Sequence, residues 1–155
     1  MTDTEFKGRP VTLTWLDPAV AVPVSAVSVV PFTGDGRVVL ARLARGVELP
    51  GGTVEPADTS PEAAARREVW EEIRVTLGPL VRVQLIRMTA GSRQTHVLVF
   101  AGRVTDLPEF VGAHESSGRL VTSCEDFVAH YGFGPAEHRR ELIRLAREAV
   151  FGTPA

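Results

Sequence analysis

The stretch from Leu49 to Val75 constrains the fold of this chain more than any other part. It opens with a proline and two glycines, continues through a loop, and ends in a glutamate-rich segment with helix-forming residues. Glu68, Glu71 and Glu72 lie within five positions of that segment. Residues three and four apart share one face of a helix, so the spacing predicts a cluster of three carboxylates. Like charges this close repel one another unless a cation lies among them.

The chemistry of the cluster indicates which cation could bind. Oxygen-only ligands are preferred by Mg²⁺, Mn²⁺ and Ca²⁺, and Mg²⁺ is usually held by a few carboxylates together with substrate phosphates. The alternative is a solvated helix face with ion pairs four residues apart, which is common in Glu- and Arg-rich helices. The preceding Pro-Gly-Gly-x-Val-Glu at residues 50–55 favours the cation site, because a surface helix has no need of such a loop.

With these residues in view, the stretch resembles the signature box of the Nudix (MutT-like) hydrolases. That box reads Gly-x5-Glu-x7-Arg-Glu-U-x-Glu-Glu-x-Gly-U, where U is a bulky apolar residue. The core Arg-Glu-U-x-Glu-Glu is intact from Arg67 to Glu72. Two features depart from the family pattern. Eight residues rather than seven separate Arg67 from Asp58, where the family usually has Glu, and Arg74 replaces the closing glycine.

The resemblance implies an α/β fold, a Nudix-like α/β/α sandwich with a mixed β-sheet between helices. It also implies hydrolysis of a pyrophosphate bond in a nucleoside diphosphate linked to another moiety, as in a nucleoside triphosphate, a nucleotide sugar or a dinucleotide. Matched position by position, the metal ligands for Mg²⁺ (or Mn²⁺) are Glu68, Glu71, Glu72 and the backbone carbonyl of Gly51. Arg67 is expected to orient the glutamates, most simply through Glu71 four residues later.

The general base is less directly indicated by the sequence. Glu115 lies in a loop similar to the family's late acidic loop, and the alternative is a solvated loop glutamate. His114 and His96 could titrate near neutrality, although His96 lies within an expected strand and is interpreted as structural. Three arginines flank strand ends where phosphates could reach: Arg42, Arg45 and Arg93.

Periodicity predicts the remaining elements. Strands are expected at residues 11–15, 24–32, 37–43, 80–88, 95–104 and 119–123, and helical segments at residues 125–130 and 136–151. Residues 33–36 form a turn that would make the second and third strands a hairpin.

The start and end of the box helix can also be predicted. Thr59 and Glu62 form a potential capping box, with Pro61 in the first turn. At the other end, Arg74 is expected to stay right-handed and the helix to break at residues 78–79. Trp70 is interpreted as a packing residue rather than a base-stacking one.

Size and composition are those of one domain. The 155 residues are expected to form a single domain, with residues 1–9 loose. A formal net charge of −2 argues against binding of duplex nucleic acid. Cys124 is the only cysteine, which fits a reducing cytosol, so a cytoplasmic location is expected. We found neither a signal-peptide core nor an apolar run long enough to span a bilayer, so no membrane partner is expected.

Two functions remain open from the sequence. The first is the metal-dependent hydrolase, acting as a monomer or homodimer on a small nucleotide diphosphate derivative. The second is a catalytically weak nucleotide-sensing or partner-binding module on the same fold. Arg74 and the loop insertion favour the second, whereas retention of all three core glutamates favours the first.

Overall fold

The computed structural model describes residues 1–109 and 116–153. Its helices are α1 (Pro61–Ile73), α2 (Cys124–His130) and α3 (Ala136–Phe151). Its strands are β1 (Thr2–Phe6), β2 (Arg9–Leu16), β3 (Ala26–Phe32), β4 (Val38–Leu43), β5 (Gly46–Glu48), β6 (Gly51–Thr53), β7 (Thr76–Leu77), β8 (Val81–Ala90), β9 (Arg93–Asp106) and β10 (Ser116–Thr122). Among the described residues, no helix is both long enough and apolar enough to cross a membrane.

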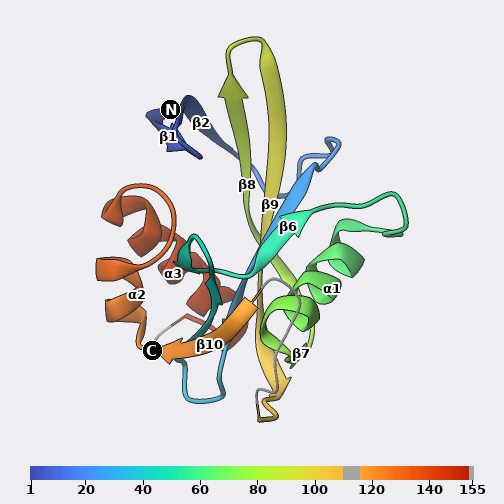
Figure 1. Ribbon diagram of the computed structural model, residues 1–155, viewed down its shortest axis with the longest axis vertical. Coiled ribbons are helices and arrows are strands. Elements are labelled where there is room, and N and C mark those ends of the chain that lie inside the picture. The colour runs from blue at the N-terminus through green and yellow to red at the C-terminus, as the bar shows by residue number, and fades with distance from the viewer. Residues whose placement is uncertain (110–115, 154–155) are drawn as a thin grey trace.

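The strands form a mixed sheet in the order β1-β2-β8-β9-β3-β4-β10 (Figure 1). β3 and β9 are parallel, and β8 and β9 form a long antiparallel hairpin. The predicted hairpin between β3 and β4 is short, since the two pair only at Phe32 and Val38. Along the rest of its length β3 pairs with β9 on one side and with β6 on the other. Both faces of β3 are buried, with Val27 and Val29 in one apolar cluster and Val30 and Phe32 in the other, which explains its nearly continuous apolar sequence.

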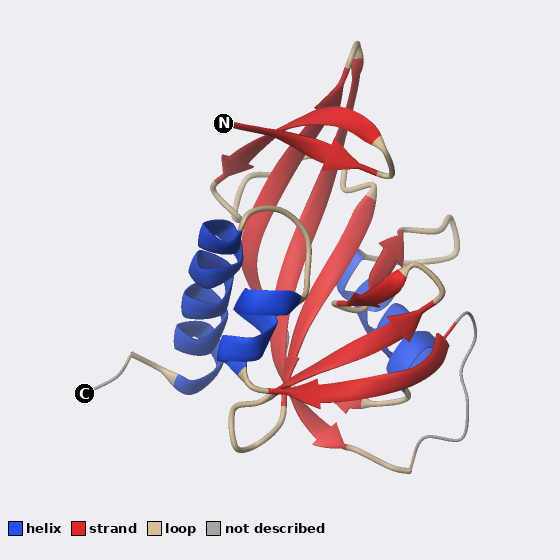
Figure 2. Cartoon of the chain, turned by 60° about the vertical axis from the view of Figure 1, so that its left-hand side comes forward, coloured by secondary structure: helices blue, strands red, loops and turns tan. Residues whose placement is uncertain are grey.

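Helices lie on both faces of this sheet, which confirms the predicted sandwich (Figure 2). One apolar cluster joins the sheet to α1, and it contains the buried Ala64, Ala65, Val69 and Ile73 of that helix. A second cluster lies on the opposite face, where α2 and α3 pack. The small alanines allow α1 to approach the sheet closely, which brings its polar residues near β6.

The ends of α1 differ from the prediction in two respects. Ser60, not Thr59, is the N-cap, and its side chain accepts a hydrogen bond from the backbone N–H of Ala63 at 3.1 Å. Pro61 then occupies the first helical position, as expected. The helix ends at Ile73 because Arg74 adopts the left-handed conformation, with φ of 54° and ψ of 44°. The prediction that Arg74 stays right-handed is therefore wrong.

The start of the chain also differs from the expectation of a loose segment over residues 1–9. Residues 2–6 form β1, which pairs antiparallel with β2 at the edge of the sheet. The ring of Trp15 on β2 stacks on His138 of α3 with 4.4 Å between centroids. Thr2 lies 3.0 Å from the same imidazole. Its polar sequence hides this strand from a pattern search, because backbone pairing rather than side-chain burial defines it.

Candidate active site

The two glycines before the box loop are required because other parts of the chain approach them too closely for a side chain to fit. Gly51 and Gly52 lie in β6 and pair with Ser28 and Val27 of β3. A Cβ atom on Gly51 would collide with the Val27 carbonyl oxygen, and one on Gly52 would lie 2.5 Å from Oε1 of Glu68. The absence of side chains here lets the carboxylate of Glu68 lie directly against the backbone of β6.

Glu72 is the most buried charged group of the box. The residue is 5% exposed, and its Oε2 has no hydrogen-bond partner among the described residues. Burial, reinforced by the negative charge of Glu68, raises the pKa of Glu72 to about 8. The backbone N–H of Gly51 and the positive charge of Arg45 act in the opposite direction. Burial beside Glu68 therefore favours the protonated form of Glu72.

Glu68 lies beside it and completes a pair. Its side chain is 12% exposed. Burial raises the pKa of Glu68, while the charge of Arg67 and a hydrogen bond with Glu72 lower it. Two carboxyl groups that share a buried site form an arrangement that a divalent cation can stabilise.

Glu71 faces a different partner. Its carboxylate accepts a hydrogen bond from Nη1 of Arg67 at 3.1 Å, and its side chain is 36% exposed. The predicted contact between Arg67 and Glu71 is therefore present. Within residues 1–109 and 116–153, no group of three or more acidic, histidine or cysteine side chains is arranged to hold a metal ion. The predicted cluster of three is thus present as a buried pair, Glu68 and Glu72, with the more exposed Glu71 beside it.

Arg67 connects the loop to the helix. Its Nε and Nη2 donate to the two carboxylate oxygens of Asp58 at 2.9 Å each. Nη1 also donates to Glu68 at 3.1 Å, and Nη2 to the carbonyl of Thr53 at 3.1 Å. The hydrogen bonds from Arg67 are the main cause that lowers the pKa of Asp58 below its usual value. The sequence suggested only the contact with Glu71, although Asp58 stands at a family position and was the available signal.

The other predicted site residues divide into near and distant ones. Arg45 is close enough to Glu72 to lower its pKa, and its Nε donates to Glu48 at 2.9 Å. Arg42 is exposed on β4, beside β10, and Arg93 is exposed where the β8–β9 turn ends. Arg45 is therefore the one of these three arginines placed near the carboxylate pair. Glu115 and His114 lie outside the described residues.

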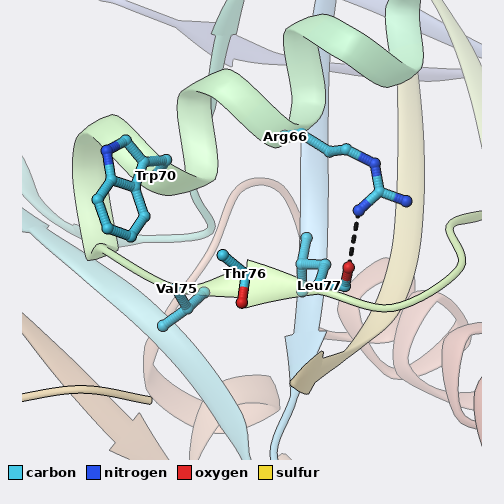
Figure 3. Close-up of a pocket in the computed structure, with 5 residues that line it drawn as sticks. All are labelled: Arg66, Trp70, Val75, Thr76 and Leu77. Carbon is cyan, nitrogen blue, oxygen red and sulfur yellow. Dashed lines mark hydrogen bonds between the residues drawn. The ribbon is translucent and has the colours of Figure 1, made fainter. Parts of the chain in front are cut away.

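A shallow pocket of about 140 Å³ lies next to α1 but contains no member of the carboxylate pair. It is lined by Arg66, Trp70, Val75, Thr76 and Leu77 (Figure 3). Arg66 donates to the carbonyl of Leu77 at 2.7 Å. Trp70 is 46% exposed, and the guanidinium of Arg74 lies 5.3 Å from its ring centroid. The indole therefore packs against its own helix end rather than in the core.

Comparison with known proteins finds proteins that are similar to this chain. Residues 22–140 match the family described as NUDIX domain. None of the curated proteins compared with the chain matches it. Among solved structures, the Escherichia coli ORF135 protein is 28% identical with a TM-score of 0.55, covering 80% of this chain and 89% of that one.

Two further structures share the fold at lower identity. A pyrophosphohydrolase of Bacillus subtilis, BsRppH, is 23% identical with a TM-score of 0.63, covering 78% of this chain and 77% of that chain. The NUDIX domain of NrtR from Shewanella oneidensis, solved with ADP ribose, is 19% identical with a TM-score of 0.63. That match covers 86% of this chain and 93% of the other.

Proposed function

Because this chain belongs to the Nudix hydrolase family, we propose that it is a pyrophosphohydrolase that depends on a divalent cation. Its substrate would be a nucleoside diphosphate linked to another moiety. We further propose that residues 1–155 act as one cytoplasmic domain, monomeric or homodimeric, with no membrane or duplex nucleic acid as partner.

One observation supports this function best: the buried carboxyl pair of Glu68 and Glu72. A polar atom buried without a hydrogen-bond partner is costly, and Oε2 of Glu72 is such an atom among the described residues. A purely structural role would be served as well by an apolar side chain at that position. A bound cation would satisfy the free oxygen and offset the repulsion between the two carboxylates.

The residues present suit Mg²⁺ or Mn²⁺ because all candidate donors are oxygens. We propose Glu68 and Glu72 as the main ligands, with Glu71 and the Gly51 carbonyl completing the set. When bound, the cation would neutralise phosphate oxygens and lower the pKa of a water molecule. Arg67 would position Glu68 and Glu71 through its hydrogen bonds to both.

Two further residues would act during hydrolysis, one on the diphosphate and one on the attacking water. Arg45, which lies near Glu72, would contribute positive charge toward the diphosphate. Glu115 is proposed as the general base that takes the proton of the attacking water, on the strength of its position in the sequence alone.

ADP-ribose is the first substrate to test. The NUDIX domain of NrtR was solved with ADP ribose, and a structure from Streptococcus suis described as an ADP-ribose pyrophosphatase is 18% identical with a TM-score of 0.57. Lys7 is the only lysine of this chain, so contacts to phosphate would come from arginines and backbone N–H groups.

A second candidate function is a nucleotide-sensing or partner-binding module with weak catalysis. The observation in its favour is that, among the described residues, no group of three acidic side chains is arranged to hold a metal ion. Such a module would bind the nucleotide without turning it over.

A substrate panel distinguishes the two functions. ADP-ribose, nucleoside triphosphates, nucleotide sugars and dinucleotides would be incubated with Mg²⁺ or Mn²⁺, with EDTA and the Glu72→Gln protein as controls. Release of AMP or pyrophosphate that needs both the cation and Glu72 supports the hydrolase. Tight binding of ADP-ribose with no turnover of any compound would replace the hydrolase by the sensing module.

A further inference from the structure

A row of polar side chains crosses strands β2, β8 and β9. Thr14 is the cross-strand partner of Arg87, and Arg87 is the partner of His96. The next strand follows without a gap, since the backbone N–H of Ser25 donates to the carbonyl of His96 at 2.9 Å. The row therefore ends beside β3, the strand that pairs with β6 of the carboxylate site.

This row lies on the same face of the sheet as α1. Two positions along each strand from Thr14, Arg87 and His96 lie leucines of the apolar cluster beneath α1: Leu16, Leu85 and Leu98. Side chains two apart on a strand share a face, so the row belongs to the α1 side. The contacts of α1 are with β3, β4, β6, β7 and β10, whereas the row lies on β2, β8 and β9. Its three side chains are partly exposed.

In the part of the chain that the structure describes, Arg87 has no ion pair with an acidic group. Among the described residues, its hydrogen bond is to an imidazole: Nε of Arg87 donates to Nε2 of His96 at 3.3 Å. No carboxylate of the described chain forms an ion pair with it, in contrast to Arg67, which contacts Asp58, Glu68 and Glu71. The two terminal nitrogens of the guanidinium make no hydrogen bond within the described residues, so their fork can bind an anion through two parallel bonds.

The neighbours of this guanidinium are also able to donate. Because Nε2 of His96 accepts from Arg87, the N–H of this imidazole is on Nδ1, which can donate. The hydroxyl of Thr14, opposite Arg87, can donate as well. A guanidinium fork, an imidazole N–H and a hydroxyl on one face match the three acceptor oxygens of a phosphate group.

The row lies apart from the carboxylate pair. Gly52 pairs with Val27, which pairs with Leu98, and His96 lies two residues further along β9. With strands about 4.8 Å apart and a rise of about 3.3 Å per residue, the backbone of His96 lies ~12 Å from Gly52. A phosphate carried by the ribose lies farther from the scissile diphosphate than the two phosphates of the diphosphate lie from each other, so it is the phosphate of the substrate that best fits a site set apart in this way.

We propose that Thr14, Arg87 and His96 form a second anion subsite, which binds a phosphate group carried by the nucleoside of the substrate. This proposal rests on the hydrolase function proposed for the chain. The chemical class is a nucleoside diphosphate derivative whose ribose bears its own phosphate, at the 2′ or 3′ position.

Calorimetry on the metal-free protein tests the subsite without hydrolysis. The probes are AMP and the 2′,5′- and 3′,5′-bisphosphates of adenosine, which differ from AMP by one phosphate. The wild-type chain should bind one of the bisphosphates about tenfold or more tightly than AMP, from charge-assisted hydrogen bonds to the added group. Arg87→Gln should reduce this preference to within about twofold. Arg82→Gln, at an exposed arginine of the same strand, should retain it.

The outcomes separate the subsite from the proposed function. Equal binding of all three probes to the wild type, or an unchanged preference in Arg87→Gln, overturns the subsite even if ADP-ribose is hydrolysed. A preference lost in Arg87→Gln supports it even if no pyrophosphate bond is cleaved, in which case the hydrolase function alone fails. Should Arg87→Gln not fold, Arg87→Lys retains the charge without the fork and should keep only part of the preference. Full retention in Arg87→Lys would contradict bidentate binding.

Discussion

The guanidinium of Arg67 and the carboxylate of Asp58 form a bidentate ion pair, with both N–H···O distances at 2.9 Å. This contact joins the box loop to the middle of α1 across the one-residue insertion. Asp58 also accepts the backbone N–H of Glu55 at 2.7 Å, which closes the loop on itself. The loop that holds the extra residue is therefore fixed to the helix by this ion pair.

The first prediction follows from that contact. Asp58→Asn removes the charge that orients Arg67, so Glu68 and Glu71 lose a fixed neighbour. We expect kcat to fall by roughly 10- to 100-fold, as for residues that orient metal ligands, with the melting temperature changed little. Asp35→Asn is the matched control, because Asp35 forms an exposed pair with Arg37 in a surface turn. Equal activity of the Asp58 variant and the control would show that Arg67 needs no such partner.

The second prediction concerns Glu72 and catalysis. Glu72→Gln removes the charge that we assign to the cation, so kcat should fall by roughly 10²- to 10³-fold, the usual loss for one group that stabilises transition-state charge. The Mg²⁺ concentration needed for half-maximal activity should rise. Activity that resists EDTA, or a variant as fast as the parent, would contradict the proposed site.

The third prediction concerns the pH dependence of stability without metal. The pKa of Glu72 is about 8 in the folded protein and close to 4.5 in the unfolded chain. Between these values the folded state holds a proton that the unfolded state has released. The free energy of unfolding should therefore fall as pH rises from about 4.5 to 8, by on the order of a few kcal/mol.

Chemical denaturation at pH 5 and pH 8 checks this dependence. In the Glu72→Gln protein the decline should be much smaller, and added Mg²⁺ should restore stability to the parent at pH 8 because ligand binding favours the folded state. A parent and a variant with the same pH dependence would rule out Glu72 as the group responsible.

The fourth prediction concerns Glu115, which we propose as the general base. Glu115→Gln should lower kcat with little change in KM, because proton transfer is lost while substrate binding remains. Steady-state kinetics with ADP-ribose, or with the best compound of the panel, gives both constants. Unaltered kcat across the pH range would remove Glu115 from the reaction.

Much of this architecture could be predicted because its signals are local. The last helix was expected at residues 136–151 and is observed as Ala136–Phe151, since its period is uninterrupted. The contact from Arg67 to Glu71 follows from helix geometry alone. The contact from Arg67 to Asp58 depends on how the loop folds back, which periodicity does not describe. Short strands such as β5 and β6 are defined by pairing with distant residues, so no pattern within three residues could identify them.

Arg74 shows a different kind of failure, and it carries the last prediction. A right-handed Arg74 was expected from intrinsic helix propensity. The structure instead ends α1 with Arg74 left-handed, and its backbone N–H donates to the carbonyl of Trp70 at 3.1 Å. The chain thus keeps at this helix end the left-handed conformation that glycine usually provides, although the residue is arginine. A non-glycine residue in this region costs about 1–2 kcal/mol, and the guanidinium over Trp70 offsets part of that cost.

Two substitutions separate these contributions. Arg74→Ala removes the contact with Trp70 but keeps the strained backbone, so it should lower the free energy of unfolding by about 0.5–1 kcal/mol. Arg74→Gly removes both, and it should be more stable than Arg74→Ala by about 1 kcal/mol. Denaturant unfolding of the three proteins gives the comparison. Turnover should stay within a few-fold of the parent in both variants, because Glu68 and Glu72 lie upstream of this residue. A glycine variant less stable than the alanine variant would show that Arg74 is right-handed in solution, and activity that appears only in Arg74→Gly would favour the sensing module over the hydrolase.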